Sequence, residues 1–328
     1  MVAKAVNVAK GETDYSTRID AETWDFIHKV EIHYPPDTVD LDVSGQRAVY
    51  NTMCGAFRQA YPAGVTAKDC LVGDVPLRCY QRQGTNADAV VLYCHGGGFV
   101  VGGLDSHDDV CAEICDQTGF AVVSVDYRLS PEYAHPAAYD DCVAAFHWVR
   151  DHYNLPLVLA GDSAGANLAA AVAHTVRTVT ALAGMVLIYP SLGPLKSTGS
   201  YAEHAHAPLL SIDEMEFYEA IRSNGADTTS DATFAPLVDN DFYGLPPTVA
   251  ISAECDPLCD DSKEYCVAIQ NAGGSAIWIN EAGLVHGYLR ARHTVNRARD
   301  SFSRIVAAFD AFGHRRDLTH SDLLNISV

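Results

Sequence analysis

The stretch LVLAGDSAGANLAAAV, residues 157–172, decides the fold, because it has the pattern of a buried strand, a tight turn and a helix. The apolar run 157–160 predicts the strand, and the alanine-rich run 164–178 predicts a packed helix. Between them stands Ser163, flanked by Gly161 and Gly165. A sharp turn here strains the serine backbone, and a Cβ atom at either glycine would collide with it. The pattern predicts a reactive serine at a helix N-terminus, where backbone N–H groups favour developing negative charge.

A second glycine-rich segment, His95-Gly96-Gly97-Gly98, follows the apolar run 89–94. Consecutive glycines let the backbone approach a ligand closely and aim its N–H groups at that ligand. We expect the N–H groups of Gly97, Gly98 and Ala164 to form an oxyanion hole. Together, the two motifs are typical of the oxyanion loop and nucleophile elbow of α/β-hydrolases.

A serine nucleophile needs a base, and the base needs an orienting acid, which in this fold follow the serine in the order acid, then histidine. His286 lies in the loop after the last predicted strand and is the expected base. Asp256 follows the strand 248–253 and is the expected acid, with Glu254 and Asp260 as competitors. Three later histidines lie on helical or tail segments, where a surface role is expected: His293, His314 and His320.

From Val75 onward, short β-rich runs alternate with helical stretches. The predicted strands are 75–80, 89–94, 121–127, 157–160, 184–189, 248–253 and 275–280. Several of these runs are apolar on consecutive residues, as strands buried on both faces are. Strands alternating with helices, such as the helix predicted over 140–152, indicate a mostly parallel central sheet flanked by helices.

Two segments do not follow this alternation of strands and helices. Residues 1–74 have helical patterns, with apolar stripes at Trp24, Ile27 and Val30 and at Val49, Met53 and Phe57. Residues 191–231 are rich in Pro, Gly, Ser and His and end in a helical run over 211–223. We therefore divide the chain into a first cap segment and lead-in (1–74), a first part of the core (75–190), a second cap segment (191–231) and a second part of the core (232–328).

The motifs resemble those of the bacterial hormone-sensitive-lipase-like esterases of the α/β-hydrolase superfamily. The matching stretches are His95-Gly96-Gly97-Gly98-Phe99, Asp126-Tyr127-Arg128-Leu129-Ser130-Pro131-Glu132, Gly161-Asp162-Ser163-Ala164-Gly165, Asp256-Pro257-Leu258 and His286-Gly287-Tyr288. The resemblance implies a triad of Ser163, Asp256 and His286, oxyanion donors at Gly97, Gly98 and Ala164, and a helical cap. It also implies short acyl chains in the substrate and a homodimer formed through the last strand of the sheet. Tyr288 departs from the phenylalanine usual in the family.

The conspicuous stretch 126–132 has a structural interpretation. We expect Arg128 and Glu132 to form a buried, hydrogen-bonded pair beside the oxyanion strand.

The substrate pocket is predicted from position alone. Apolar or aromatic residues on loops and cap segments near the catalytic positions are its candidates: Phe99, Leu104, Tyr189, Leu209, Phe217, Val285 and Tyr288.

The composition of the chain argues against nucleic acid and membranes as binding partners. Lysine plus arginine number 22 and aspartate plus glutamate 42, a net charge of −20, which repels nucleic acid and anionic membranes. The apolar runs are too short to span a bilayer, and no secretory signal is visible, so we expect a cytoplasmic protein. The ten cysteines form no C-x-x-C pair, and we expect reduced, mostly buried thiols and no metal. The chemistry requires no cofactor.

The sequence thus predicts a serine carboxylesterase acting on small esters. Two alternatives stay open. The same triad can cleave an amide, carbamate or lactone. A ligand receptor on a hydrolase scaffold, as in the plant gibberellin receptors of this superfamily, is the other; such receptors have lost a catalytic residue, whereas all three are present here.

Overall fold

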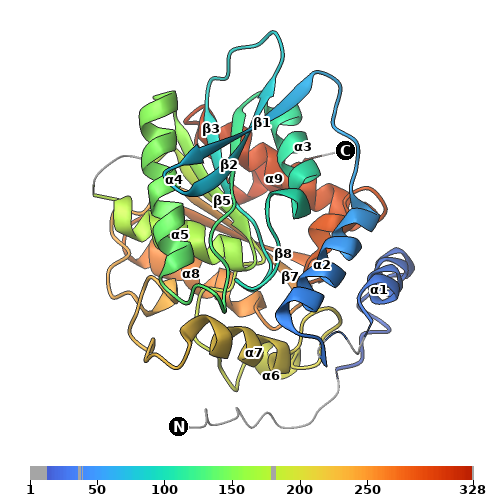
Figure 1. Cartoon of the computed structure of the whole chain (residues 1–328). Coiled ribbons are helices and arrows are strands. Elements are labelled where there is room, and N and C mark those ends of the chain that lie inside the picture. Colours follow the sequence, from blue (N-terminus) through green and yellow to red (C-terminus); the bar gives the residue numbers. More distant parts are fainter. Residues whose placement is uncertain (1–12, 36–37, 39, 179–181, 327–328) are drawn as a thin grey trace.

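The computed structural model of the chain describes residues 13–35, 38, 40–178 and 182–326. Eight strands form one sheet in the order β1–β2–β4–β3–β5–β6–β7–β8 (Figure 1). They are β1 (Val65–Val72), β2 (Val75–Arg82), β3 (Val90–Cys94), β4 (Ala121–Val125), β5 (Leu157–Asp162), β6 (Gly184–Ile188), β7 (Thr248–Cys255) and β8 (Ala276–Val285). The strands from β4 to β8 in this order run parallel, and β2 pairs antiparallel with β1 and β4. The mostly parallel sheet is confirmed.

Helices cover both faces of the sheet because its central strands are apolar on both sides. In β3, Val90 and Leu92 belong to one hydrophobic cluster, while Val91 and Tyr93 belong to another. The first cluster contains residues of α4 (Ala137–Tyr153), α5 (Ala164–Val176) and α8 (Cys259–Asn271). The second contains residues of α3 (Asp108–Thr118) and α9 (Asn296–Gly313). The expected three-layer arrangement follows from this alternation.

All seven predicted strands are present, but the structure adds β1, which lies within the segment 1–74 that was expected to be helical. β1 is the edge strand of the sheet, and Val65 is its one buried residue, while Leu71 is 68% exposed. A strand with so little buried surface has no apolar run, and therefore its sequence carries no strong strand signal.

Four helices lie away from the two layers: α1 (Ala21–His33), α2 (Val43–Phe57), α6 (Ser200–Glu203) and α7 (Ile212–Ser223). In Figure 1, α6 and α7 lie below the sheet, and α1 and α2 lie beside them. α7 begins with a capping box, in which Ser211 and Glu214 each bond the other's backbone N–H. No helix of the described residues is long and apolar enough to cross a membrane.

Short helical turns lie between these elements: η2 (Leu104–Ser106), η3 (Pro236–Val238) and η4 (Tyr288–Ala291). The last helix of the described residues is α10 (His320–Leu324). The ten cysteines are free thiols, eight of them buried, as expected.

Candidate active site

Ser163 sits at the turn between β5 and α5. Its backbone has φ 53° and ψ −122°, a conformation that side-chain-bearing residues rarely adopt. The turn is held because the Ser163 N–H donates to the Ile188 carbonyl over 2.9 Å. A Cβ on Gly161 would collide with the Gly165 backbone, and a Cβ on Gly165 would collide with the Cys94 carbonyl. These close approaches explain why both positions of the motif are glycine.

A chain of two hydrogen bonds connects Ser163 to a buried carboxylate. His286 Nε2 lies 2.9 Å from Ser163 Oγ, and His286 Nδ1 lies 2.7 Å from Asp256 Oδ2. Asp256 follows β7 and is fully buried, and His286 follows β8. Because β7 and β8 are parallel neighbours beside β6 and β5, the loops after them meet at the same edge as Ser163.

The two competing acids point elsewhere. Glu254 accepts a hydrogen bond from the Gly283 N–H over 2.7 Å, and Asp260 accepts one from the Ser200 N–H over 2.8 Å. Of the three carboxylates, Asp256 is therefore the one that contacts His286.

The loop after β3 bends sharply at its glycines, with φ 128° at Gly97 and 59° at Gly98. A side chain at Gly97 would collide with the Val101 carbonyl, and the ring of Tyr218 would lie 2.6–2.8 Å from a Cβ on Gly98. The backbone of this loop can therefore reach the cavity in front of Ser163, which Gly97, Gly98 and Ala164 all line. The three backbone positions predicted as oxyanion donors therefore lie beside the same cavity.

Asp162, next to the serine, holds the glycine loop from behind. It accepts hydrogen bonds from the Gly96 N–H and the Tyr93 hydroxyl, over 3.0 and 2.9 Å, and His107 Nε2 lies 3.2 Å away. Burial alone would raise the pKa of Asp162, but His107 and the hydrogen bonds hold that pKa well below its usual value. Sequence reasoning missed this residue, since the x of G-x-S-x-G can be any amino acid.

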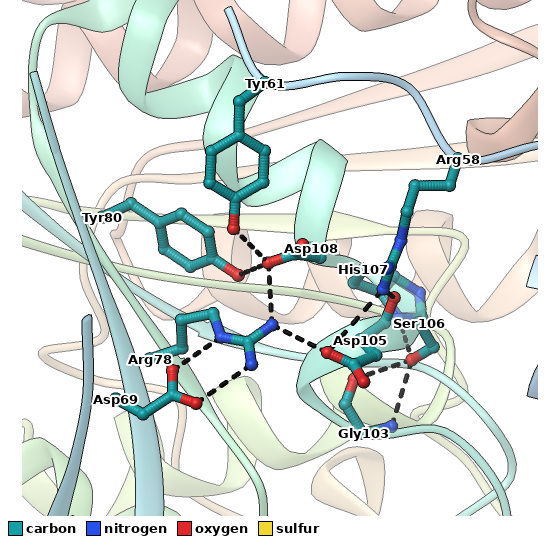
Figure 2. A network of polar contacts seen from close by, with 10 residues as sticks. All are labelled: Arg58, Tyr61, Asp69, Arg78, Tyr80, Gly103, Asp105, Ser106, His107 and Asp108. Carbon is teal, nitrogen blue, oxygen red and sulfur yellow. Dashed lines mark hydrogen bonds and ion pairs between the residues drawn. The ribbon is translucent and has the colours of Figure 1, made fainter. Parts of the chain in front are cut away.

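A polar network extends from His107 to the edge of the sheet (Figure 2). Ser106 Oγ lies 2.8 Å from His107 Nδ1, and the next residue, Asp108, accepts hydrogen bonds from Tyr61, Tyr80 and Arg78. Arg78 also pairs with Asp69 of β1 and with Asp105. These contacts connect the β1–β2 hairpin to α3 and so to the loop behind the serine.

The buried imidazole of His95, in the glycine-rich loop, makes the stability of the protein depend on pH in a way that can be measured. His95 is fully buried, its Nδ1 donates to the Gly96 carbonyl, and its Nε2 has no partner. Burial, aided by His107, lowers the pKa of His95 from 6.5 to about 4. Between pH 6.5 and pH 4, His95 is therefore protonated in the unfolded chain and still largely neutral in the folded chain. Because the unfolded state binds the extra proton, the free energy of unfolding falls as the pH falls.

We expect this effect to reach about 3 kcal/mol at pH 4. Urea unfolding of the wild-type protein and of His95→Asn at pH 7 and pH 4.5 measures it. Changes in net charge affect both proteins equally, so the stability advantage of wild type over variant should shrink on acidification. An advantage that stays constant with pH would contradict the prediction.

A cavity of about 350 Å³ opens in front of the serine. Of the seven predicted pocket residues, Phe99, Tyr189 and Leu209 line it. The Tyr189 ring also lies edge-on to His286, with ring centroids 4.8 Å apart. Aromatic and charged residues that the sequence did not single out complete the lining, among them Tyr34, Tyr50, Tyr218, Arg222 and Arg290.

The other four predicted pocket residues do not line the cavity. Val285 and Tyr288 are fully buried in the core, and the Tyr288 hydroxyl is bonded to Ser301 rather than aimed at the site. Phe217 is 39% exposed on α7, where its neighbour Tyr218 takes the inward position. Leu104 lies in η2, which leads into α3. Their places near the motifs in sequence were misleading, because the neighbouring residue on a strand or helix faces another direction.

The expected Arg128–Glu132 pair is not formed. Arg128 pairs with Asp141 of α4 at 2.8 Å, and Glu132 pairs with Arg47 of α2 at 2.7 Å. The side chains of Arg128 and Glu132 are 44% and 52% exposed, so neither is a buried charge. Both observed partners lie outside the stretch 126–132, on two separate helices, and spacing within the stretch does not reveal them.

Among the described residues, no group of three or more His, Cys, Asp or Glu side chains is placed to hold a metal ion.

The chain is similar in sequence and in structure to known α/β-hydrolases and esterases. A family model described as the α/β-hydrolase fold matches residues 91–290. The chain is 38% identical over 248 residues to the carboxylesterase NlhH of Mycobacterium tuberculosis, covering 72% of this chain and 77% of that protein. It is 31% identical over 300 residues to an acetyl esterase of Salmonella schwarzengrund, covering 87% and 92%. A solved esterase of the bacterial hormone-sensitive lipase family has a TM-score of 0.81 at 26% identity, covering 89% of this chain and 98% of that one.

Proposed function

Because the chain belongs to the α/β-hydrolase family and resembles its hormone-sensitive-lipase-like esterases, we propose that it hydrolyses carboxylic esters through Ser163, His286 and Asp256. The observation that carries the proposal is the pair of hydrogen bonds that joins these three side chains, of which Ser163 and His286 line a cavity. A serine hydroxyl in contact with an imidazole, itself in contact with a buried carboxylate, is the arrangement that activates serine as a nucleophile.

In the first half-reaction, Ser163 Oγ attacks the ester carbonyl carbon while His286 Nε2 takes the hydroxyl proton. Asp256 keeps the other imidazole proton on Nδ1 and stabilises the imidazolium that forms. The N–H groups of Gly97, Gly98 and Ala164 stabilise the negative charge on the carbonyl oxygen. His286 then gives its proton to the departing alcohol, which leaves an acyl group on Ser163.

In the second half-reaction, water replaces the alcohol. His286 takes a proton from this water as the water attacks the acyl carbon, and the oxyanion hole again holds the developing charge. When the tetrahedral intermediate collapses, the proton returns to Ser163 Oγ and the carboxylic acid is released.

The described parts of the segments 1–74 and 191–231 supply the cap in this proposal, except for β1, which belongs to the sheet; residues 1–12, 36–37 and 39 lie outside the described residues. The support is that residues of α1, α2 and α7 line the cavity, for example Phe26, Met53 and Tyr218. Tyr218 packs directly over Gly98, so α7 also limits the space above the glycine loop. A site enclosed in this way favours small substrates.

We expect initial rates on p-nitrophenyl esters from acetate to laurate to be highest for the short acyl chains. A cavity of about 350 Å³ lies at the small end of the range for ligand sites, and a lauryl chain would have to project out of it. Rates that rise toward laurate would contradict the short-chain preference, and no hydrolysis of any chain length would contradict the esterase proposal itself. Matched amide substrates, measured alongside, distinguish an esterase from an amidase.

A further inference from the structure

The largely buried arginines of the described residues fall into two groups. Four of them pair with carboxylates: Arg78 with aspartates of its network, Arg177 with Asp239 and Asp241, Arg292 with Asp109 and Glu113, and Arg304 with Glu281. Arg222 and Arg290 form none of the ion pairs found in the described part of the chain, and both line the cavity in front of Ser163. A buried cation without an anion is costly, so each of the two needs an explanation.

The contacts of Arg222 within the protein explain how its guanidinium group can be buried without an ion pair. Its Nη1 donates to the Phe234 carbonyl over 3.0 Å, and its Nη2 donates to Asn167 Oδ1 over 3.2 Å. The ring centroids of Phe99 and Phe234 lie 3.6 and 4.1 Å from its central guanidinium carbon, within the range of cation–π contacts. Arg222 is held by the protein alone.

The central carbon of Arg290 lies 5.2 Å from the ring centroid of Tyr50, a cation–π contact, but its side-chain hydrogen bonds among the described residues come from one nitrogen alone. Its Nη2 donates to the Tyr50 hydroxyl over 2.5 Å and contacts Cys54 Sγ, a weak acceptor, at 3.5 Å. Its Nε is buried and has no hydrogen-bond partner among the residues that the structure describes. No hydrogen bond of Nη1 is found among the described residues, and a Cβ on Gly287 would lie 3.5 Å from this atom. Nη1 therefore lies beside the backbone that follows His286, where Arg290 lines the cavity.

The acidic groups that line the cavity form no ion pair with Arg290 among the described residues. The negative charge of Asp162 helps to raise the pKa of Arg290, but Asp162 forms no ion pair with it among the described residues. The two oxygens of Asp162 already contact Tyr93, Gly96, His107 and Tyr189. Three glutamates also line the cavity: Glu31, Glu214 and Glu219. The first is exposed, the second is bonded to Ser211 in the helix cap, and burial raises the pKa of the third.

We propose that Arg290 binds a carboxylate carried by the substrate, so that the preferred substrate is an ester with a free carboxylate group in its acyl or alcohol part. This inference rests on the proposed esterase function and adds a substrate class to it. A guanidinium with free N–H donors in a partly enclosed cavity is suited to a carboxylate, and charge-assisted hydrogen bonds are the stronger kind. The aromatic and aliphatic lining accommodates the rest of a small ester.

Two pairs of esters test the inference, because each pair has nearly the same shape and differs in charge. Monoethyl succinate against ethyl 4-methylpentanoate places the carboxylate in the acyl part. Acetoxyacetate against isobutyl acetate places it in the alcohol part. We expect kcat/KM of the wild-type protein to favour the carboxylate member of at least one pair by about 10- to 100-fold. The reaction with monoethyl succinate consumes one water and yields succinate and ethanol.

The variants Arg290→Met and Arg290→Lys locate the effect. The methionine variant should lose the preference, while the lysine variant, which keeps a charge, should retain part of it. Arg299→Met is the matched control, because Arg299 is exposed and contacts Asn296, and its replacement removes the same charge; it should keep the wild-type preference. Succinate should also inhibit the wild-type protein competitively and inhibit Arg290→Met more weakly.

A wild-type protein that hydrolyses the neutral esters at least as well as the charged ones would overturn the inference and leave the esterase function intact. A preference that persists in Arg290→Met would overturn it as well. A wild-type protein that hydrolyses none of the four esters would instead contradict the esterase function. Because the wild-type comparison needs no variant, the test stands even if Arg290→Met fails to fold.

Discussion

Ser163→Ala is expected to lower kcat for p-nitrophenyl acetate by about 10⁴-fold or more. The hydroxyl that attacks the carbonyl is then missing, and His286 Nε2, now 2.9 Å from Oγ, loses the group whose proton it takes. The cavity, the glycine loop and the other two side chains remain, so some acceleration over the uncatalysed reaction should persist. Steady-state rates with a background correction measure the loss.

The same variant should fold normally. The alanine introduced by Ser163→Ala would adopt the same strained backbone, because that conformation is imposed by the Ile188 carbonyl and by the close approach of Gly161 and Gly165. Thermal unfolding of Ser163→Ala should therefore match that of the wild-type protein. Activity within tenfold of wild type in a correctly folded variant would exclude Ser163 as the nucleophile.

The parts of this molecule that were predictable from sequence are those whose physics is local. The turn at Ser163 demands small residues at fixed positions on either side, and so it leaves a pattern in five consecutive residues. The central strands are buried on both faces, and so they leave continuous apolar runs. Because a parallel sheet brings the ends of its strands to one edge, the loops that carry Asp256 and His286 could be placed from strand order alone.

The cavity lining was less predictable, because it depends on how distant helices pack. Tyr218 enters the cavity while its neighbour Phe217 faces outward, a choice set by the rotation of α7 over the glycine loop. Tyr50 and Arg290 are in contact although 240 residues separate them in the sequence, and no local sequence pattern predicts such a contact. Edge strand β1 was missed for a related reason: it buries so little that its sequence resembles that of any exposed segment.

Asp256→Asn is expected to lower kcat by about 10⁴-fold, although the substitution changes the shape of the side chain very little. Asp256 Oδ1 accepts a hydrogen bond from the Leu258 N–H over 2.9 Å, and Oδ2 faces His286 Nδ1. An asparagine would keep its carbonyl oxygen on the Leu258 N–H, and its NH₂ group would then face the imidazole. His286 Nδ1 would have to accept that hydrogen bond, so the proton of the neutral imidazole would move to Nε2. An Nε2 that already carries a proton cannot take one from Ser163.

The neighbouring acids supply matched controls for this prediction. Glu254→Gln and Asp260→Asn remove the same charge on either side of Asp256, from β7 and α8, but Glu254 and Asp260 bond the backbone of Gly283 and Ser200 rather than the imidazole. We expect both control variants to stay within about tenfold of wild type in kcat, since loss of a non-catalytic hydrogen bond costs roughly 1 kcal/mol. The decisive measurement is kcat of the three variants, side by side with their thermal unfolding. If either control lost as much activity as Asp256→Asn while remaining folded, negative charge on either side of Asp256, rather than the tautomer held by Asp256, would be what the imidazole requires.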